Sequence, residues 1–263
     1  MFDPADVAGR ADWQPDVRTS VPVRRAVVLA AGNGDRFQSK TAPSKLLVPV
    51  AGLPLISRTL LTAARAGIQL IDVIVGYQAD AVRAAAVWTP LRGVTLRFHY
   101  NDRWHEENGV SALVSQPHVG DERFALLMGD HIFNWQVLER MLVQRVAADE
   151  SLLAVDRREA SPERVAEATK VRLAGDRITA IGKQIDPFDA LDTGVFVFSS
   201  PIFAALEESA AAGDTSLSGG VRRLAARGLM RGVDTGGSAW WDLDTVEDLH
   251  HLQSSNFDLE IEV

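Results

Sequence analysis

The chain has 263 residues, of which 46% are hydrophobic and 24% charged, values that allow a sizeable buried core in one or two α/β domains. It contains no cysteine, which excludes disulfides, thiolate zinc sites and a cysteine nucleophile. The formal charge of −8 argues against a nucleic-acid-binding surface, because such a surface needs a basic face. No apolar run approaches the roughly 20 residues that span a bilayer, and the acidic N-terminus is unlike a signal peptide. We therefore expect a cytoplasmic protein with no membrane partner.

Residues 1–22 carry three prolines among several aspartates and show no clear period, so we interpret them as an N-terminal extension. No linker, repeat or low-complexity tract follows them. The sequence therefore predicts one domain over residues 23–263.

The first half of this domain alternates short apolar strands with helices. The predicted strands cover residues 26–30, 71–75, 94–100 and 124–128, and the predicted helices cover 55–66 after Pro54, 80–86, and a segment from Trp135 capped by Asn134. This alternation predicts a parallel sheet with right-handed connections.

The second half adds a hairpin and further strands to the sheet. The predicted elements are strands over 151–155, 191–198 and 230–233, a hairpin of 169–173 and 177–181, and helices over 201–212 capped by Ser200, 220–226 and from Thr245. The hairpin turns at Ala174-Gly175-Asp176, and the last helix begins with a capping box formed by Thr245 and Asp248.

A glycine turn, Gly32-Asn33-Gly34, follows the first strand. Backbone N–H groups in such a turn can bind phosphate oxygens, and two cations, Arg36 and Lys45, follow it in the sequence. Ligands of open α/β sheets bind beyond the carboxyl ends of the strands, where the strand order reverses. The turn is therefore predicted to bind phosphate, although a simple strand-to-helix turn beside two solvated cations explains the pattern as well.

Asp130 follows the buried strand 124–128 and should point into the same crevice as the glycine turn. Mg²⁺ is usually held by one or two carboxylates together with substrate phosphates, which makes Asp130 a candidate ligand. A turn or a helix cap is the structural alternative. The neighbouring His131 could be a packed histidine that orients Asp130.

The glycine turn and its flanks make the chain recognisable. The segments LAAGNGDRF and PSKLLVPVAGLPLI resemble the start of the nucleotidyltransferases that activate sugar and alcohol phosphates, the MobA-like NTP transferases. Later segments are most similar to CTP:inositol-1-phosphate cytidylyltransferases, namely NGVSALV, LLMGDHIF, EATKVRL, ITAIGK, DTGVFVF and WWDLDTVEDL. The resemblance implies a Rossmann-like three-layer α/β fold with a central mixed, mostly parallel sheet.

The resemblance also assigns site residues. It implies catalytic roles for Arg36, Lys45 and Lys183, and nucleotide binding by Leu29, Ala30, Ala31, Gly32, Asn33, Gly34, Asn108, Gly109 and Ser111. It implies acceptor binding by Glu167, Lys170, Lys183, Asp192, Thr193 and Gly194, with Glu167 and Lys170 on one strand and Gly194 leaving room for a substrate ring. It implies that Asp130 and Asp242 hold Mg²⁺.

Structural alternatives stand beside several of these assignments. Asp244 competes with Asp242 as the second ligand, although capping of the last helix explains Asp244 adequately. The Asn108 segment could equally be a helix-opening turn capped by Ser111. The Asp192 segment could be a strand-end turn, and Lys183 a solvated lysine.

The implied function is Mg²⁺-dependent transfer of a nucleotidyl group from a nucleoside triphosphate, expected to be CTP, to a phosphate monoester, expected to be inositol 1-phosphate or a related cyclitol phosphate, with release of pyrophosphate. Because the acceptor phosphate is already an oxyanion, no protein nucleophile is needed. The alternatives are a sugar 1-phosphate, another cyclitol phosphate or a phosphonate as acceptor with another nucleotide, and a nucleotide-binding regulatory module without turnover. The sequence does not indicate an oligomeric state.

Overall fold

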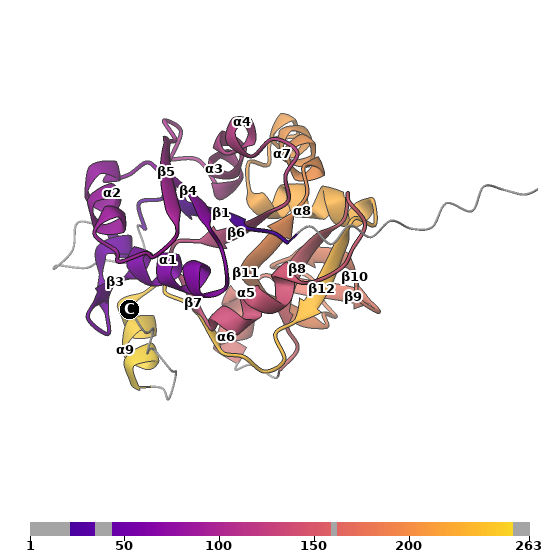
Figure 1. Ribbon diagram of the computed structural model, residues 1–263. Helices are drawn as coiled ribbons and strands as arrows, with labels where there is room; N and C mark the ends of the chain where they lie inside the picture. The colour runs from indigo at the N-terminus through magenta and orange to yellow at the C-terminus, as the bar shows by residue number, and fades with distance from the viewer. Residues whose placement is uncertain (1–21, 35–43, 159–161, 255–263) are drawn as a thin grey trace, which may run out of the picture.

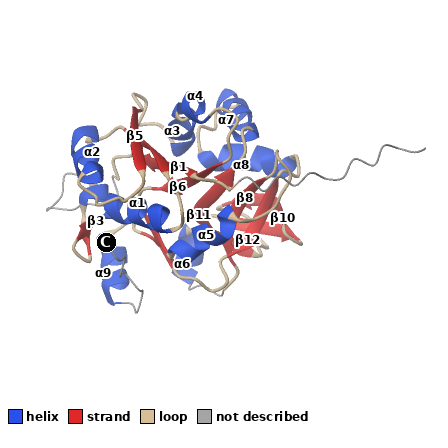
Figure 2. Cartoon of the chain, viewed as in Figure 1, coloured by secondary structure: helices blue, strands red, loops and turns tan. Residues whose placement is uncertain are grey.

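The computed structural model describes residues 22–34, 44–158 and 162–254, and in this part of the chain helices cover both faces of a central sheet (Figures 1 and 2). The predicted extension, apart from its last residue, and Arg36 lie outside the described residues. None of the described helices has the length and apolar character needed to cross a bilayer.

Nine strands of the described chain form the central sheet, in the order β5-β4-β1-β6-β11-β8-β12-β10-β9. The first four in this order run parallel, which confirms the prediction for the first half of the chain. They are β1 (Arg25–Ala30), β4 (Leu70–Val75), β5 (Thr95–Tyr100) and β6 (Phe124–Met128). Every residue of β1 is buried, as expected for a strand that is covered on both faces.

The second half of the chain extends this sheet with mostly antiparallel strands. These are β8 (Ser151–Asp156), β9 (Lys170–Ala174), β10 (Arg177–Gly182), β11 (Ala190–Phe198) and β12 (Met230–Asp234). Strand β11 runs antiparallel to both β6 and β8, whereas β12 runs parallel to β8. The predicted β9–β10 hairpin forms, and β9 also pairs with β11. The strands β11, β8, β12, β10 and β9 therefore close into a ring at this end of the sheet.

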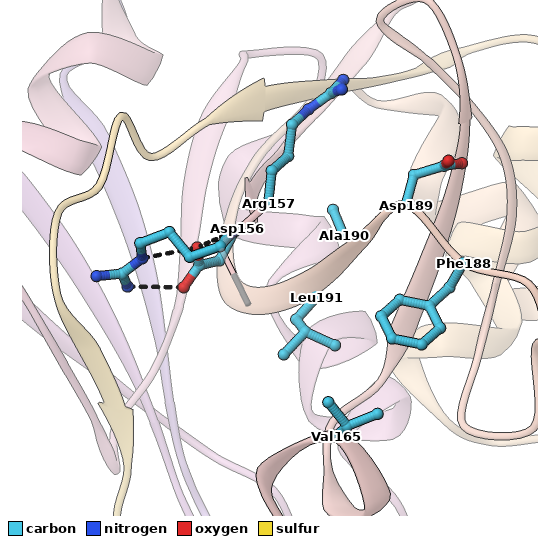
Figure 3. A pocket seen from close by; sticks show the side chains of 8 residues that line it. Asp156, Arg157, Val165, Phe188, Asp189, Ala190 and Leu191 are labelled. Atoms are coloured by element: carbon cyan, nitrogen blue, oxygen red, sulfur yellow. Dashed lines mark hydrogen bonds and ion pairs between the residues drawn. The ribbon is translucent and has the colours of Figure 1, made fainter. Parts of the chain in front are cut away.

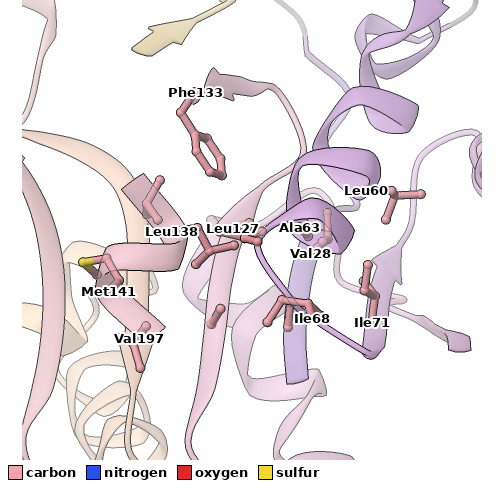
Figure 4. Close-up of a cluster of buried hydrophobic side chains, with 14 of the residues drawn as sticks. Val28, Leu60, Ala63, Ile68, Ile71, Leu127, Phe133, Leu138, Met141 and Val197 are labelled. Carbon is pink, nitrogen blue, oxygen red and sulfur yellow. The ribbon is translucent and has the colours of Figure 1, made fainter. Parts of the chain in front are cut away.

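Alternating side chains of the strands point to two helical layers. The first layer comprises α1 (Leu55–Arg65), α2 (Ala79–Val87) and α5 (Trp135–Leu142), and its core includes Val28 of β1 and Leu127 of β6 (Figure 4). The second comprises α3 (Asn108–Val114), α7 (Pro201–Ala211) and α8 (Leu217–Ala226), and it packs on Val27 and Leu126 from the same two strands. Asn134 and Ser200 precede α5 and α7 as predicted, but neither side chain makes a capping hydrogen bond.

Several short elements were not predicted from the sequence. They are η1 (Lys45–Leu47), β2 (Pro49–Val50), β3 (Leu53–Pro54), α4 (Gln116–Val119), β7 (His131–Phe133), α6 (Pro162–Glu167) and β13 (Trp240–Asp242). Glu167 is consequently the last residue of α6, and the prediction that it shares a strand with Lys170 is wrong. The last helix, α9 (Val246–Ser254), begins where the Thr245 capping box predicted.

Candidate active site

The glycine turn and Asp130 lie at the point where the strand order reverses. From β1 the chain continues to β4 and β5 on one side, and then crosses to β6 on the other side of β1. The ends of β1 and β6 are joined directly, because the Gly129 N–H donates to the Leu29 carbonyl oxygen over 2.9 Å. The turn and the carboxylate therefore share the crevice position that the strand-order rule predicts.

A small two-stranded sheet brings Asp242 to Asp130. Strand β7 starts immediately after Asp130 and pairs antiparallel with β13, so that His131 lies opposite Asp242. The Leu243 N–H also donates to the Asp130 carbonyl oxygen over 3.3 Å. As a result, one ligand atom each from Asp130, His131 and Asp242 lie within 4.8 Å of one another. This separation is short enough for the two carboxylates to share one cation.

Lys45 is buried between these carboxylates. Its Nζ lies 2.8 Å from Asp130 Oδ2, 2.8 Å from Asp244 Oδ1 and 3.9 Å from Asp242 Oδ1. Burial by itself would lower the pKa of Lys45, but the three carboxylates outweigh it and raise this pKa above its usual range. The lysine stem packs against the glycine turn, since a Cβ added to Gly34 would lie 2.8 Å from Lys45 Cβ. Lys45 is therefore a permanent cation that connects the glycine turn to the carboxylates.

His131 is a second cation of the cluster. Its Nδ1 donates to the Thr193 carbonyl oxygen over 2.9 Å, and its Nε2 lies 3.5 Å from Asp242 Oδ1 and 4.0 Å from Asp130 Oδ1. Burial lowers the pKa of His131, but attraction to Asp242 and Asp130 dominates and raises it to about 10. The ring lies where a Cβ on Gly194 would be, 2.3 Å from two of its atoms. Gly194 thus makes room for His131, whereas the sequence analysis expected it to make room for a substrate ring.

Thr245 and Asp248 make capping hydrogen bonds at the start of the last helix, so capping is not needed to explain Asp244. The carboxylate of Asp248 accepts hydrogen bonds from the backbone N–H groups of Asp244 and Thr245 over 3.0 and 2.7 Å, and the Asp248 N–H donates to Thr245 Oγ1. Those residues close the capping box between themselves. The Asp244 side chain accepts from Lys45 instead, which makes it a third carboxylate of the cluster.

The residues predicted to contact the nucleoside make structural contacts. Asn108 Oδ1 accepts from the Leu217 N–H over 2.9 Å, and a Cβ on Gly109 would lie 2.4 Å from the Thr215 carbonyl oxygen. Ser111 lies inside α3, where its Oγ accepts from Asn101, so it is not the helix cap. These contacts explain why α3 packs closely on the start of α8. Nucleoside binding by this segment stays a prediction.

The residues predicted for the acceptor lie on α6, β9 and β11, except for Lys183, which directly follows β10. Lys170 Nζ donates to the Lys183 carbonyl oxygen over 2.6 Å, and Lys183 is exposed. Asp192 Oδ1 accepts from the Gly194 N–H over 2.8 Å, and burial raises the pKa of Asp192 to about 6 even though this hydrogen bond and the His131 charge lower it. Thr193 donates to the Ala154 carbonyl oxygen. Their roles in acceptor binding stay predictions.

Asp156 is a site residue that the sequence analysis missed. Its Oδ2 accepts from Trp240 Nε1 over 2.9 Å, so it fixes the first residue of β13, and Arg158 donates to both of its oxygens. Burial would raise the pKa of Asp156, but the hydrogen bonds from Arg158 and Trp240 lower it below its usual range. The signal was available in the sequence, because Asp156 ends a buried strand as Asp130 follows one.

This fold, with cations and carboxylates gathered beside a glycine turn at the switch point, defines a protein of the nucleotidyltransferase class. The chain belongs to the MobA-like NTP transferase family, whose domain model matches residues 26–229. The family expected from the sequence is thereby confirmed.

Individual relatives are similar over most of the chain. The bifunctional IPC transferase and DIPP synthase of Rubrobacter xylanophilus is 36% identical over 227 residues, which cover 85% of this chain and 50% of that protein. The protein of the same name from Archaeoglobus fulgidus is 35% identical over 230 residues, which cover 87% of this chain and 43% of that protein. The chain thus spans about half the length of these curated relatives.

A solved structure agrees with the fold. The inositol-1-phosphate CTP transferase from T. maritima superposes with a TM-score of 0.77 at 26% identity, over 88% of this chain and 93% of that chain. The predicted α/β nucleotidyltransferase fold is therefore confirmed.

Proposed function

We propose that this chain transfers a nucleotidyl group from CTP to inositol 1-phosphate and releases pyrophosphate. The observation that carries the proposal is the connection of the glycine turn, through Lys45, to the carboxylates of Asp130 and Asp242 at one edge of the sheet. A buried lysine beside a glycine turn supports triphosphate binding, and the neighbouring carboxylates support binding of a divalent ion. The names of the relatives support CTP as the donor and an inositol phosphate as the acceptor.

The donor set of the cluster fits Mg²⁺. Two carboxylates whose oxygens lie within 4.8 Å of each other are hard oxygen ligands, which Mg²⁺ combines with water and substrate phosphates. His131 suits this ion less well, since Mg²⁺ prefers oxygen ligands and the Nδ1 of the ring is hydrogen-bonded to the Thr193 carbonyl oxygen. We infer that Asp130 and Asp242 hold Mg²⁺, which when bound would neutralise charge on the triphosphate. Lys45 contacts Asp130 through Oδ2, whereas Asp130 Oδ1 is the oxygen that lies toward His131.

The remaining residues position the two substrates. A Cβ added to Gly32 would meet no atom of the described residues within 4 Å, which supports an approach of phosphate oxygens to the backbone there. Lys170 and Lys183 supply positive charge on the acceptor side. Since the acceptor phosphate attacks as an oxyanion, the protein acts by positioning and by stabilising charge, without a general base. The cytoplasmic location expected from the sequence stays a prediction.

Pyrophosphate release tests the proposal. The protein is assayed with Mg²⁺, with each of the four common ribonucleoside triphosphates, and with inositol 1-phosphate, glucose 1-phosphate, glycerol 3-phosphate and a phosphonate as acceptors. We expect the highest kcat/KM for CTP with inositol 1-phosphate, and loss of this activity in Asp130→Asn. Asp121→Asn is the matched control, because Asp121 is an exposed carboxylate before β6, at the opposite end of the strand that Asp130 follows. Binding of CTP without release of pyrophosphate in the presence of any of these acceptors would favour a regulatory nucleotide-binding module.

A further inference from the structure

A pocket of about 370 Å³ opens where β8 ends and β11 begins (Figure 3). We call it the Phe188 pocket, and its lining includes Asp156, Arg157, Val165, Phe188, Asp189 and Leu191. These residues differ from those predicted to bind the acceptor. Its volume lies in the range that small-molecule sites occupy, which is roughly 300–1,000 Å³.

The pocket combines an apolar floor with a polar rim whose described side chains carry no net charge. Val165, Phe188 and Leu191 contribute apolar surface, and Leu191 is buried. The rim carries two carboxylates, Asp156 and Asp189, and the guanidinium groups of Arg157 and Arg158, so the formal charges cancel.

The two rim carboxylates are fixed by hydrogen bonds. Asp156 is held by Arg158 and Trp240, and Asp189 Oδ2 accepts from the Leu173 N–H over 2.7 Å. An apolar floor beneath preorganised donors and acceptors suits a neutral ring that carries hydroxyl groups. A phosphate group would find no net positive charge among the described rim residues.

The pocket borders the predicted acceptor residues on one side. Lys170 lies directly opposite Leu191 in the β9–β11 pair, so the two side chains share one face of the sheet. Lys170 Nζ is 6.0 Å from the centre of the Phe188 ring and donates to the Lys183 carbonyl oxygen. Positive charge suitable for a phosphate therefore stands at the edge of the pocket.

The pocket also borders the carboxylate cluster. Asp156, on its rim, accepts from Trp240 Nε1, and Trp240 begins the strand that ends in Asp242. Trp240 faces the His131 ring at 6.4 Å between centres. The pocket is thus separated from the cluster by the width of one aromatic side chain.

We propose that the Phe188 pocket holds the neutral, hydroxylated ring of the acceptor, with the acceptor phosphate directed toward Lys170. This inference rests on the proposed function and deepens it, because it names the acceptor class as cyclic polyol monophosphates. The ring's C–H face packs on Phe188, and its hydroxyl groups bind the rim. An acyclic acceptor covers less of the floor and is used less well.

Phe188→Ala tests the pocket through the two Michaelis constants. We expect the KM for inositol 1-phosphate to rise about tenfold, as for loss of one aromatic contact, while the KM for CTP changes less than about twofold. Phe188→Leu, which keeps an apolar contact, should raise the acceptor KM less. Phe98→Ala is the matched control, since Phe98 is also half-buried beneath a cation, with the Arg83 guanidinium carbon 5.3 Å from its ring centre, but lies in β5 at the far edge of the sheet.

The outcomes separate this inference from the proposed function. If the wild type is active and both Phe188→Ala and Phe98→Ala have the wild-type KM for inositol 1-phosphate, the pocket assignment is wrong and the proposed function stands. Better use of glycerol 3-phosphate than of inositol 1-phosphate also overturns the assignment. If the wild type turns over no acceptor, the function fails, and calorimetric titration with inositol 1-phosphate decides about the pocket. Binding that weakens about tenfold in Phe188→Ala alone supports the pocket, whereas unchanged binding, or none to the wild type, overturns it.

Discussion

Replacing Gly194 with alanine should perturb the carboxylate cluster through His131. The His131 ring packs against Gly194, which lies in the irregular first part of β11. Gly194 has a φ of +74°, which costs an L-residue about 1–2 kcal/mol. The new Cβ would also lie 2.3 Å from His131 Nδ1 and Cε1, so the ring must move away from the Thr193 carbonyl oxygen. Overpacking of this kind adds about 1–3 kcal/mol. We therefore expect Gly194→Ala to lower the free energy of unfolding by about 2–5 kcal/mol, combining the backbone cost with the packing cost.

Gly175→Ala separates the backbone cost from the clash. Gly175 has a φ of +66° in the β9–β10 turn, and a Cβ there would meet no atom within 4 Å in the part of the chain that the structure describes. This variant should lose only the roughly 1–2 kcal/mol of the left-handed conformation. Urea unfolding of both variants measures how much more unfolding free energy Gly194→Ala loses than Gly175→Ala. Most of this extra loss should disappear when Gly194→Ala is introduced into a His131→Ala background, because the ring is then gone. Equal unfolding free energies for Gly194→Ala and Gly175→Ala would refute the argument that His131 needs this glycine.

Further predictions concern the metal, the triphosphate and pH. Asp130→Ala should lower kcat by about 10²–10³ with little change in the urea midpoint, and normal turnover would show that Asp130 is not a ligand. Lys45→Ala and Arg36→Ala should raise the KM for CTP more than that for the acceptor, since Lys45 packs on the glycine turn, and steady-state kinetics in which only the acceptor KM rises would contradict this. His118 has a lowered pKa, caused by burial and by the charge of His99, whose ring it stacks on at 3.7 Å. The folded protein then binds fewer protons than the unfolded chain below about pH 6.5, the unperturbed histidine pKa, so stability is lost as the pH falls through that value. His118→Gln should lose less stability than the wild type between pH 8 and pH 5 in urea unfolding, and equal losses would count against this assignment.

The sequence predicts elements that carry their own local signal. Strand β6 was placed at its observed bounds because five apolar residues stand between polar neighbours, and the β9–β10 hairpin because a glycine sits between two strand-like runs. Strands β7 and β13 have three residues each, which is too short for a period. They are stable only as a pair of remote segments, and that pairing cannot be read from either one alone.

The site was predictable to a similar degree. The glycine turn and Asp130 follow β1 and β6, parallel strands whose carboxyl ends lie at the same edge of the sheet, so their proximity could be predicted. Lys45 belongs to η1 and was singled out only as a cation that follows the turn in the sequence. The hydrogen bond from Lys45 to Asp244 was not predictable, because Asp244 lies two residues before a helix and a cap was an adequate explanation. The predicted capping box of Thr245 and Asp248 forms, so this helix start does not depend on Asp244.

The β7–β13 pair also sets the order in which the protein becomes competent during synthesis. The central sheet is complete once β12 has emerged at Asp234, and the family match itself ends at residue 229. Asp242 and Asp244 follow only afterwards, on a strand that docks against β7. A chain that ended at Asp234 would contain every strand of the central sheet but only one of the three carboxylates, Asp130. On the proposed mechanism it would be inactive, and turnover therefore reports that the chain has been translated past residue 242.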